Sequence, residues 1–354
     1  MNVLIKTSQE LTLEQITAYL RQLRQHAVVE SSHFSVAAII QVQQPQGQYA
    51  YVCGVNVEHR EHNRLSMHAE QNAIVAAQSL LGDGTRFINA WVMGALNTID
   101  ENSDHELASN FVRPCGHCRQ ILMSFSLPET KIYSITVKGV QSEPEDMGSL
   151  LPNAFSERDL ANDKPSTPPN MSEAHAMPSN LFSLPVSPKA QPKRLLQHSM
   201  RLSDDNIRLH CQATKPHIIN ATFETSAIHA CMILVETKQG PRYFSGALVQ
   251  DIAFLTTDAI FASVGQAVTA LGGNGLLLKE IHLFGPDLSL EHLDDMNLSG
   301  CELSHLKRFS DAQTLVTFHN TTGSSDVFTL AEVQAMMFRP KAQAPDQQSM
   351  TLYG

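Results

Sequence analysis

The sequence contains no apolar run long enough to span a membrane, and its N-terminus lacks the basic region and apolar core of a signal peptide. An excess of positive charge is also missing, because 25 Lys and Arg face 35 Asp and Glu and leave a formal net charge of −10. An acidic protein repels phosphate backbones, so we expect neither nucleic acid nor a membrane as a partner. We expect the cysteines to be unpaired thiols, which are typical of a reducing compartment and predict a cytoplasmic location.

Only two of the six cysteines are closely spaced, Cys115 and Cys118 in the run Pro-Cys-Gly-His-Cys. A lone C-x-x-C is compatible with a redox pair or with half of a structural zinc site. Upstream lie His68 and Glu70 in the run His-Ala-Glu, so the complete pattern reads H-x-E…P-C-x-x-C. This pattern is the signature of zinc-dependent nucleobase deaminases, and we favour it over the redox and structural alternatives.

The residue types in this pattern suit a hydrolytic zinc site. One imidazole and two thiolates hold Zn²⁺ tetrahedrally and leave a fourth position for water, whose pKa the metal lowers. We therefore expect His68, Cys115 and Cys118 to bind one zinc ion per chain. A carboxylate that is not a ligand can carry protons between water, a ring nitrogen and a leaving amine, which makes Glu70 the candidate catalytic residue.

The surroundings of the motif predict two helices next to a sheet. Apolar residues follow His68 at three- and four-residue spacing up to Gly82, which predicts a helix with His68 and Glu70 in its first turn. Pro114 suits the first position of a second helix, on which both cysteines share a face. Strands alternate with helices over roughly residues 30–160, which indicates a sheet covered by helices. The expected strands are Ser35–Val42, Tyr49–Val57, Ile88–Ala95 and Ile132–Val137.

Further runs resemble the cytidine deaminases. Asn56-Val57-Glu58 is similar to the N-x-E motif that binds ribose in that family. The run from Ser32 to Val36 is similar to its S-x-F-x-V segment, whose Phe, here Phe34, packs against the base. Residues 150–155 resemble the segment that closes the catalytic domain. The sequence most resembles the large homodimeric bacterial type, in which a catalytic domain precedes a degenerate copy of itself.

The resemblance implies a three-layer α/β/α domain with a mixed sheet, present twice, the second copy being degenerate. It implies a zinc enzyme of pyrimidine salvage that acts on cytidine and 2′-deoxycytidine as a homodimer. The residues that it assigns to substrate binding are Asn56, Val57, Glu58, Phe34 and Ala69. Two features depart from the family pattern: Ala37 replaces a usual Gly, and the loop Leu96–Arg113 is longer than expected. Because this loop leads directly into the second helix, it is expected to affect the pocket rim.

Composition divides the chain into five parts. Residues 1–28 are expected to be an N-terminal helical segment, with a capped amphipathic helix from Ser8 to about His26. Residues 29–162 form the expected catalytic domain, and residues 163–198 are a linker rich in Pro and Ser. Residues 199–338 are the expected degenerate domain, and residues 339–354 are a tail.

The degenerate domain repeats the apolar pattern of the first and lacks its chemistry. His229–Val235 matches Val36–Val42, Tyr243–Val249 matches Tyr51–Val57, Ala262–Gly275 matches the helix ending at Gly82, and the run from Ile281 to Gly285 matches the strand at Ile88. In this register, Ala259 and Phe261 occupy the places of His68 and Glu70, so the second copy is expected to be non-catalytic.

Three functions remain open at this point. The first is deamination of cytidine and 2′-deoxycytidine. The second is deamination of a modified or analogue cytosine nucleoside, which the long loop would permit. The third is a non-enzymatic zinc-stabilised module, against which Glu70 argues because a structural site needs no carboxylate there. Asn56 and Glu58 favour the first function over the second, because they can hydrogen-bond a free ribose hydroxyl.

Overall fold

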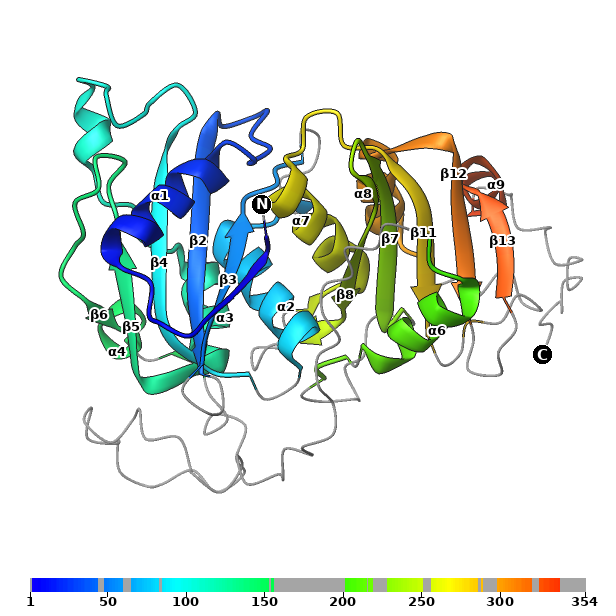
Figure 1. Cartoon of the computed structure of the whole chain (residues 1–354), viewed down its shortest axis with the longest axis horizontal. Coiled ribbons are helices and arrows are strands. Elements are labelled where there is room, and N and C mark those ends of the chain that lie inside the picture. The colour runs from blue at the N-terminus through cyan, green and yellow to red at the C-terminus, as the bar shows by residue number, and fades with distance from the viewer. Residues whose placement is uncertain are drawn as a thin grey trace, which may run out of the picture.

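Two mixed sheets lie side by side in the computed structural model of the 354-residue chain (Figure 1). The structure describes residues 2–43, 48–59, 65–82, 85–152, 154–155, 201–214, 216–218, 228–250, 256–285, 288, 298–319 and 325–337. The expected domain boundaries at 162–163, 198–199 and 338–339, and with them the linker and the tail, lie outside these residues and stay predictions.

The first sheet has the strand order β1-β3-β2-β4-β5-β6, and only β4 and β5 run parallel to each other. Its strands are β1 (Leu4–Thr7), β2 (Phe34–Gln43), β3 (Tyr49–Val55), β4 (Phe87–Leu96), β5 (Ser126–Ser134) and β6 (Glu145–Asp146). Its helices are α1 (Leu13–Arg24), α2 (Ala69–Leu81), the 3-10 turn η3 (Glu106–Ser109), α3 (Gly116–Phe125) and α4 (Met147–Leu150). Helix α1 packs on one face of the sheet and α2 packs on the other, which gives the three-layer arrangement that the resemblance implies.

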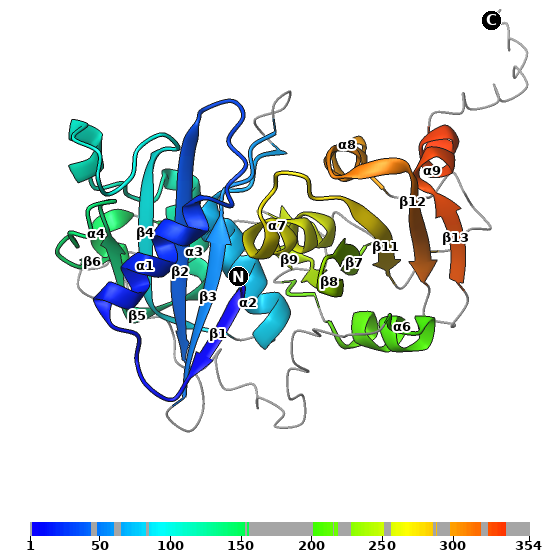
Figure 2. The same cartoon turned by 45° about the horizontal axis from the view of Figure 1, so that its top comes forward.

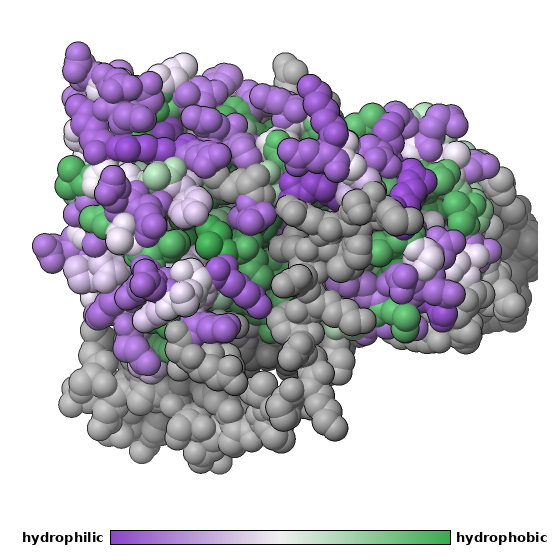
Figure 3. All heavy atoms as spheres, viewed as in Figure 1, coloured by the Kyte–Doolittle hydropathy of each residue, from purple (hydrophilic) through white to green (hydrophobic). Residues whose placement is uncertain are grey.

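The N-terminal segment contains a helix as expected and, before it, the strand β1, which pairs with β3 and so belongs to the first sheet. Helix α1 begins only after Thr12, whose hydroxyl accepts a hydrogen bond from the Gln15 backbone N–H in a capping box. Its apolar residues Ile16, Leu20 and Leu23 are buried against the sheet. Hydrophilic residues cover much of the outer face of the molecule around this helix (Figure 3).

The second sheet has the order β13-β12-β11-β7-β8, and only β11 and β12 are parallel. Its strands are β7 (Ala230–Thr237), β8 (Gly240–Ala247), β11 (Leu278–Phe284), β12 (Ser310–His319) and β13 (Ser325–Thr329), with the short pair β9 (Val249–Gln250) and β10 (Thr256–Thr257) beside it. Its helices are α6 (Asp204–Ala213), α7 (Ala259–Leu271), α8 (Gly300–Arg308) and α9 (Leu330–Met337). Helix α6 lies in front of this sheet while α7 and α8 lie behind it (Figure 1, Figure 2).

The second half therefore repeats the topology of the first, with β7, β8, β11 and β12 in the places of β2, β3, β4 and β5. The two copies meet through their central helices, since α2 packs against α7 and β8, while α7 also packs against β3. Helix α2 is buried on every side from Ala69 to Gln78, because both sheets cover it.

The close approach of strand and helix corrects the register of the repeat. A Cβ atom added to Gly54 would lie 2.2 Å from the carbonyl oxygen of Ala69, and one added to Gly246 would lie 2.4 Å from that of Ala259. Ala259 therefore corresponds to Ala69, and Asp258 takes the place of His68 at the helix N-cap. The sequence register, which put Ala259 and Phe261 in the places of His68 and Glu70, was wrong by one residue; the counterpart of Glu70 is Ile260.

No helix among the described residues is both long enough and apolar enough to cross a membrane.

Candidate active site

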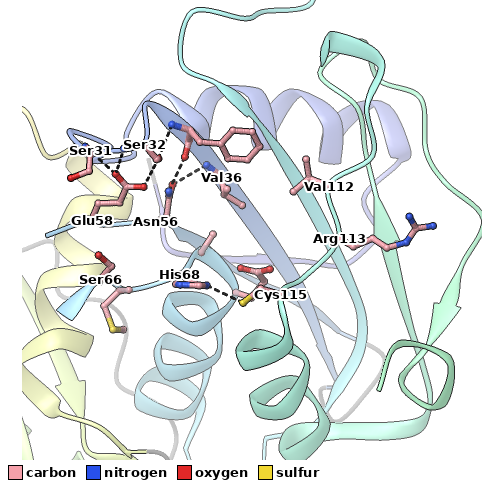
Figure 4. A pocket seen from close by; sticks show the side chains of 14 residues that line it. Ser31, Ser32, Val36, Asn56, Glu58, Ser66, His68, Val112, Arg113 and Cys115 are labelled. Carbon is pink, nitrogen blue, oxygen red and sulfur yellow. Dashed lines mark hydrogen bonds between the residues drawn. The ribbon is translucent and has the colours of Figure 1, made fainter. Parts of the chain in front are cut away.

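The motif residues meet where the N-termini of α2 and α3 converge (Figure 4). His68 is the N-cap residue of α2, and Glu70 lies in the first turn of that helix. Cys115 is the N-cap residue of α3, and Cys118 is one turn further along it. Pro114 precedes the cap and does not occupy the first helical position, which falls to Gly116. Both helix N-termini direct their positive dipole ends toward the thiols, and this favours thiolates.

The three expected metal ligands form a compact cluster. The Nδ1 atom of His68 lies 3.4 Å from the Cys115 sulfur and 3.3 Å from the Cys118 sulfur. Among the described residues, this is the one group of three or more His, Cys, Asp or Glu whose ligand atoms all lie within 4.8 Å of one another. Nitrogen and sulfur ligands at tetrahedral angles around one zinc ion are separated by roughly 3.5 Å, so the donor set fits zinc.

The electrostatics of the cluster differ between the two thiols. Hydrogen bonds from Cys118 and His68 lower the pKa of Cys115 to about 3. The pKa of Cys118 is raised well above its ordinary value, first because its thiol donates to Cys115 and then because it is buried. The hydrogen bond with Cys115 raises the pKa of His68. Cys115 is therefore the more acidic of the two thiols among the protein groups alone, and a bound zinc ion would hold both sulfurs as thiolates.

Glu70 is buried, with 5% of its surface exposed, and burial raises the pKa of its carboxyl group. Glu70 lines the same cavity as His68 and Cys115. A carboxyl group with a raised pKa exchanges protons near neutral pH more readily than an exposed one, which suits a general acid and base.

A cavity of about 590 Å³ opens in front of the cluster, a volume suited to a small molecule. Among its lining residues are five of those expected from the sequence to bind substrate or act on it: Phe34, Asn56, Glu58, Ala69 and Glu70. Val57 is not among the described lining residues; its side chain is buried and its backbone exchanges two hydrogen bonds with Met67.

Asn56 and Glu58 lie at the other end of the cavity from the cysteines (Figure 4). The Asn56 amide accepts a hydrogen bond from the Val36 backbone N–H at 2.8 Å and donates one to the Phe34 carbonyl oxygen at 2.9 Å. Asn56 therefore joins the end of β3 to the start of β2, and fixes the backbone that carries Phe34.

Sequence reasoning missed the residues that hold Glu58. The backbone N–H groups of Ser31 and Ser32 donate to its carboxylate at 3.2 and 3.0 Å, and the Ser32 hydroxyl also donates to it. In the sequence, Ser32 was noted only as the first residue of the S-x-F-x-V run, and no partner for its side chain could be predicted. Its contact with Glu58 spans 26 residues and arises from the fold.

The long loop contributes Val112 and Arg113 to the cavity wall. The Arg113 guanidinium pairs with the Glu145 carboxylate, its Nε lying 2.8 Å from the nearer oxygen, and its side chain points away from the cysteines (Figure 4). Because this charge is already paired, the rim carries no free cation from Arg113.

The first sheet has α1 on one face and α2 on the other, and the helices α2 and α3 present a His-Cys-Cys cluster and a buried glutamate to one cavity. This combination defines the class of zinc-dependent deaminases. Residues 11–134 match the family model for the cytidine and deoxycytidylate deaminase zinc-binding region. A cytidine deaminase of Sporosarcina psychrophila is 30% identical over 151 residues, which cover 43% of this chain and 96% of that relative. The chain belongs to the cytidine deaminase family and is a hydrolytic deaminase.

Two solved structures are also similar. The cytidine deaminase of Burkholderia pseudomallei is 24% identical, and the match covers 41% of this chain and all of that chain with a TM-score of 0.32. That of Mycobacterium tuberculosis is 24% identical, with 42% of this chain and 99% of that chain covered and a TM-score of 0.31.

Proposed function

We propose that this enzyme converts cytidine and 2′-deoxycytidine, with water, to uridine and 2′-deoxyuridine and ammonia, using one zinc ion per chain. The observation that carries the proposal is the arrangement of the cavity, with the His68, Cys115 and Cys118 cluster and Glu70 at one end and Glu58 at the other. A cytosine base at the cluster would place its sugar at Glu58.

In this proposal His68, Cys115 and Cys118 hold the metal, in line with the fit of their donor atoms. When bound, zinc would lower the pKa of a water ligand and so supply the nucleophile. Glu70 would take one proton from the attacking water and pass it to N3 of the cytosine ring. It would then move the second water proton, by that stage on the hydroxyl at C4, to the departing amine. Ala69 and Phe34 enclose the base, and the fixed, buried walls exclude bulk water from it.

Glu58 and Asn56 are proposed to hydrogen-bond the sugar. The three hydrogen bonds from Ser31 and Ser32 hold the Glu58 carboxylate at the cavity wall, where it can accept a hydrogen bond from a sugar hydroxyl group. A site built around such an acceptor disfavours substrates that lack the hydroxyl, because the carboxylate is then left unpaired. Free bases are therefore expected to be poor substrates.

The test of this function is ammonia release by the purified enzyme across cytosine, adenine and guanine nucleosides, bases and nucleotides. We expect activity with cytidine and 2′-deoxycytidine only. Preference for a modified cytosine nucleoside would support the second candidate instead, with Val112 and Arg113 of the long loop as the residues that select it.

The second test concerns Glu70→Gln. Because one carboxyl group serves several proton transfers, we expect kcat to fall by at least about a hundredfold while zinc content and substrate binding persist. Glu14→Gln, at an exposed position in α1, is the matched control and should leave kcat unchanged. Retention of about a tenth of the wild-type kcat by Glu70→Gln would mean that another group transfers these protons.

A further inference from the structure

Helix α8 of the second half contacts the first half next to the cavity. Nη2 of Arg308 lies 3.1 Å from the Glu30 carboxylate, and the Ser304 hydroxyl lies 3.4 Å from Nε2 of His59. Ser304 and Arg308 are four residues apart and so share one face of α8. Glu30 directly precedes Ser31, and His59 directly follows Glu58. One helix face therefore contacts both segments from which the sugar end of the cavity is built.

These two segments depend on each other. The Val28 backbone N–H donates to the Asn56 carbonyl oxygen at 3.0 Å, and the Glu58 N–H donates to the Val28 carbonyl oxygen at 2.8 Å. The Glu58 carboxylate in turn accepts from Ser31 and Ser32. A displacement of either segment would change the direction of the Glu58 carboxylate, since its donors lie on one segment and its backbone on the other.

The face of α8 that makes these contacts is anchored in the core of the second half. His305 is 1% exposed and stacks on Phe261 with ring centroids 4.1 Å apart. The Arg308 guanidinium lies 5.5 Å from the centre of the Phe309 ring, and only 15% of the Arg308 side chain is exposed. A helix fixed in this way can hold the neighbouring segments in place.

The ion pair itself is only partly shielded, because 55% of the Glu30 side chain is exposed. Pairs of this kind add little to the free energy of unfolding. They can still restrict the position of a loop, and that restriction matters here because the loop carries the donors of Glu58.

We propose that Ser304 and Arg308 are positioning residues for the sugar: by holding His59 and Glu30, they fix the Glu58 carboxylate where it meets a sugar hydroxyl. This inference rests on the proposed function. It gives the half that has lost the catalytic residues a specific task in the site of the same chain.

The experiment compares steady-state kinetics of the full-length zinc enzyme, Arg308→Gln and the double variant Ser304→Ala/Arg308→Gln, with cytidine and with 2′,3′-dideoxycytidine. We expect KM for cytidine to rise roughly tenfold in the double variant and kcat to stay within about a factor of two, because the groups that move protons are untouched. With the dideoxynucleoside, which lacks the hydroxyls that Glu58 would bind, KM should be unchanged by the substitutions.

Arg201→Gln is the matched control, because its ion pair with Glu280 at 2.8 Å lies within the second half. The exchange Glu30→Arg/Arg308→Glu should restore most of the lost affinity for cytidine, and it keeps the test informative if a single variant folds poorly. An equal rise in KM for both nucleosides, or unchanged KM for cytidine, would overturn the inference alone. Absence of cytidine deamination by the wild-type enzyme would overturn the proposed function and the inference with it.

Discussion

At the residue scale, the metal cluster combines two thiols in unlike environments. Cys115 is exposed at its helix cap, whereas Cys118 is buried beneath it. The cysteine that bears the low pKa is thus the one that solvent, and an incoming metal ion, can reach. Neither thiol has another cysteine partner, since all six cysteines of the chain are free. The His68 imidazole beside both sulfurs completes a zinc donor set, which a redox pair of thiols does not need.

Zinc content is expected to depend on Cys115 and not on the other exposed cysteine. Elemental analysis of the purified wild-type protein should give about one zinc per chain, and Cys115→Ala should lose most of it, because two ligands hold zinc far more weakly than three. Cys301→Ala is the matched control, because Cys301 is also exposed and free and lies in the second half. Full zinc content in Cys115→Ala would refute the assignment.

The three proposed zinc ligands could be selected from the sequence because zinc chemistry restricts both the residue types and their spacing, and the structure brings these three side chains together. The partners of Glu58 could not be predicted, because Ser31 and Ser32 have no distinctive chemistry and reach Glu58 only through the fold. The same holds for Arg308, which lies 278 residues from Glu30 in the sequence and has no motif.

At the element scale, the helices α2 and α7 occupy matching places in the two halves but carry different residues at their N-termini. Each has 13 residues and ends at a glycine with positive φ, Gly82 or Gly272. Asp258, at the N-terminus of α7, takes the place of His68. Glu302, one turn into α8, takes the place of Cys118. The sequence register was wrong by one residue because α7 is buried from Ala259 to Ala270 and its apolar residues mark no single face. The terminal glycines Gly82 and Gly272 match one to one and fix the register.

The carboxyl groups of Asp258 and Glu302, which interact with each other, are expected to make stability depend on pH. Burial raises the pKa of Asp258 to about 6, and burial together with Asp258 raises that of Glu302 to about 7. Both values lie above those of an unfolded chain, so the folded state binds protons more tightly. The resulting stabilisation is complete below about pH 4 and is lost as the pH rises to about 7.

Glu302→Gln removes the free-energy cost of ionising a buried carboxyl group at high pH. The Gln side chain can still accept a hydrogen bond from the Ser299 backbone N–H in the capping box. Chemical denaturation should show equal stability of variant and wild type at pH 4 and a variant more stable by about 2 kcal/mol at pH 8. Glu14→Gln should show no such trend. A difference that does not change with pH would contradict the assignment.

At the scale of the whole molecule, the two halves bury each other's central helices. The Ser79 hydroxyl accepts a hydrogen bond from the Ala247 backbone N–H at 2.9 Å, and the Gln71 amide donates to the Thr257 hydroxyl at 2.9 Å. Gln71 follows Glu70 directly and its side-chain oxygen accepts from the His68 backbone N–H. The second half therefore supports the helix turn that carries the proposed metal ligand His68 and the proposed proton carrier Glu70.

The duplication could be predicted from the strand pattern, because apolar strands keep their spacing even where the chemistry is lost. The contact between the halves could not, since the residues that make it, such as Gln71 and Thr257, are polar and carry no periodic signal. The homodimer implied by the family resemblance likewise stays a prediction, since it concerns surfaces beyond one chain.

Truncation before Pro165 tests the contribution of the second half to the active site. In the fragment, the face of α2 that packs on α7 and β8 would be exposed to water. We expect the fragment to self-associate or aggregate through this face and to retain less than about a hundredth of the wild-type kcat/KM, because the turn at His68 loses its support from Thr257. Sedimentation of the full chain should give twice its mass of 39.0 kDa, as expected for a homodimer. A monomeric fragment with full activity would show that the second half is dispensable for the site, and a monomeric full-length enzyme would refute the dimer.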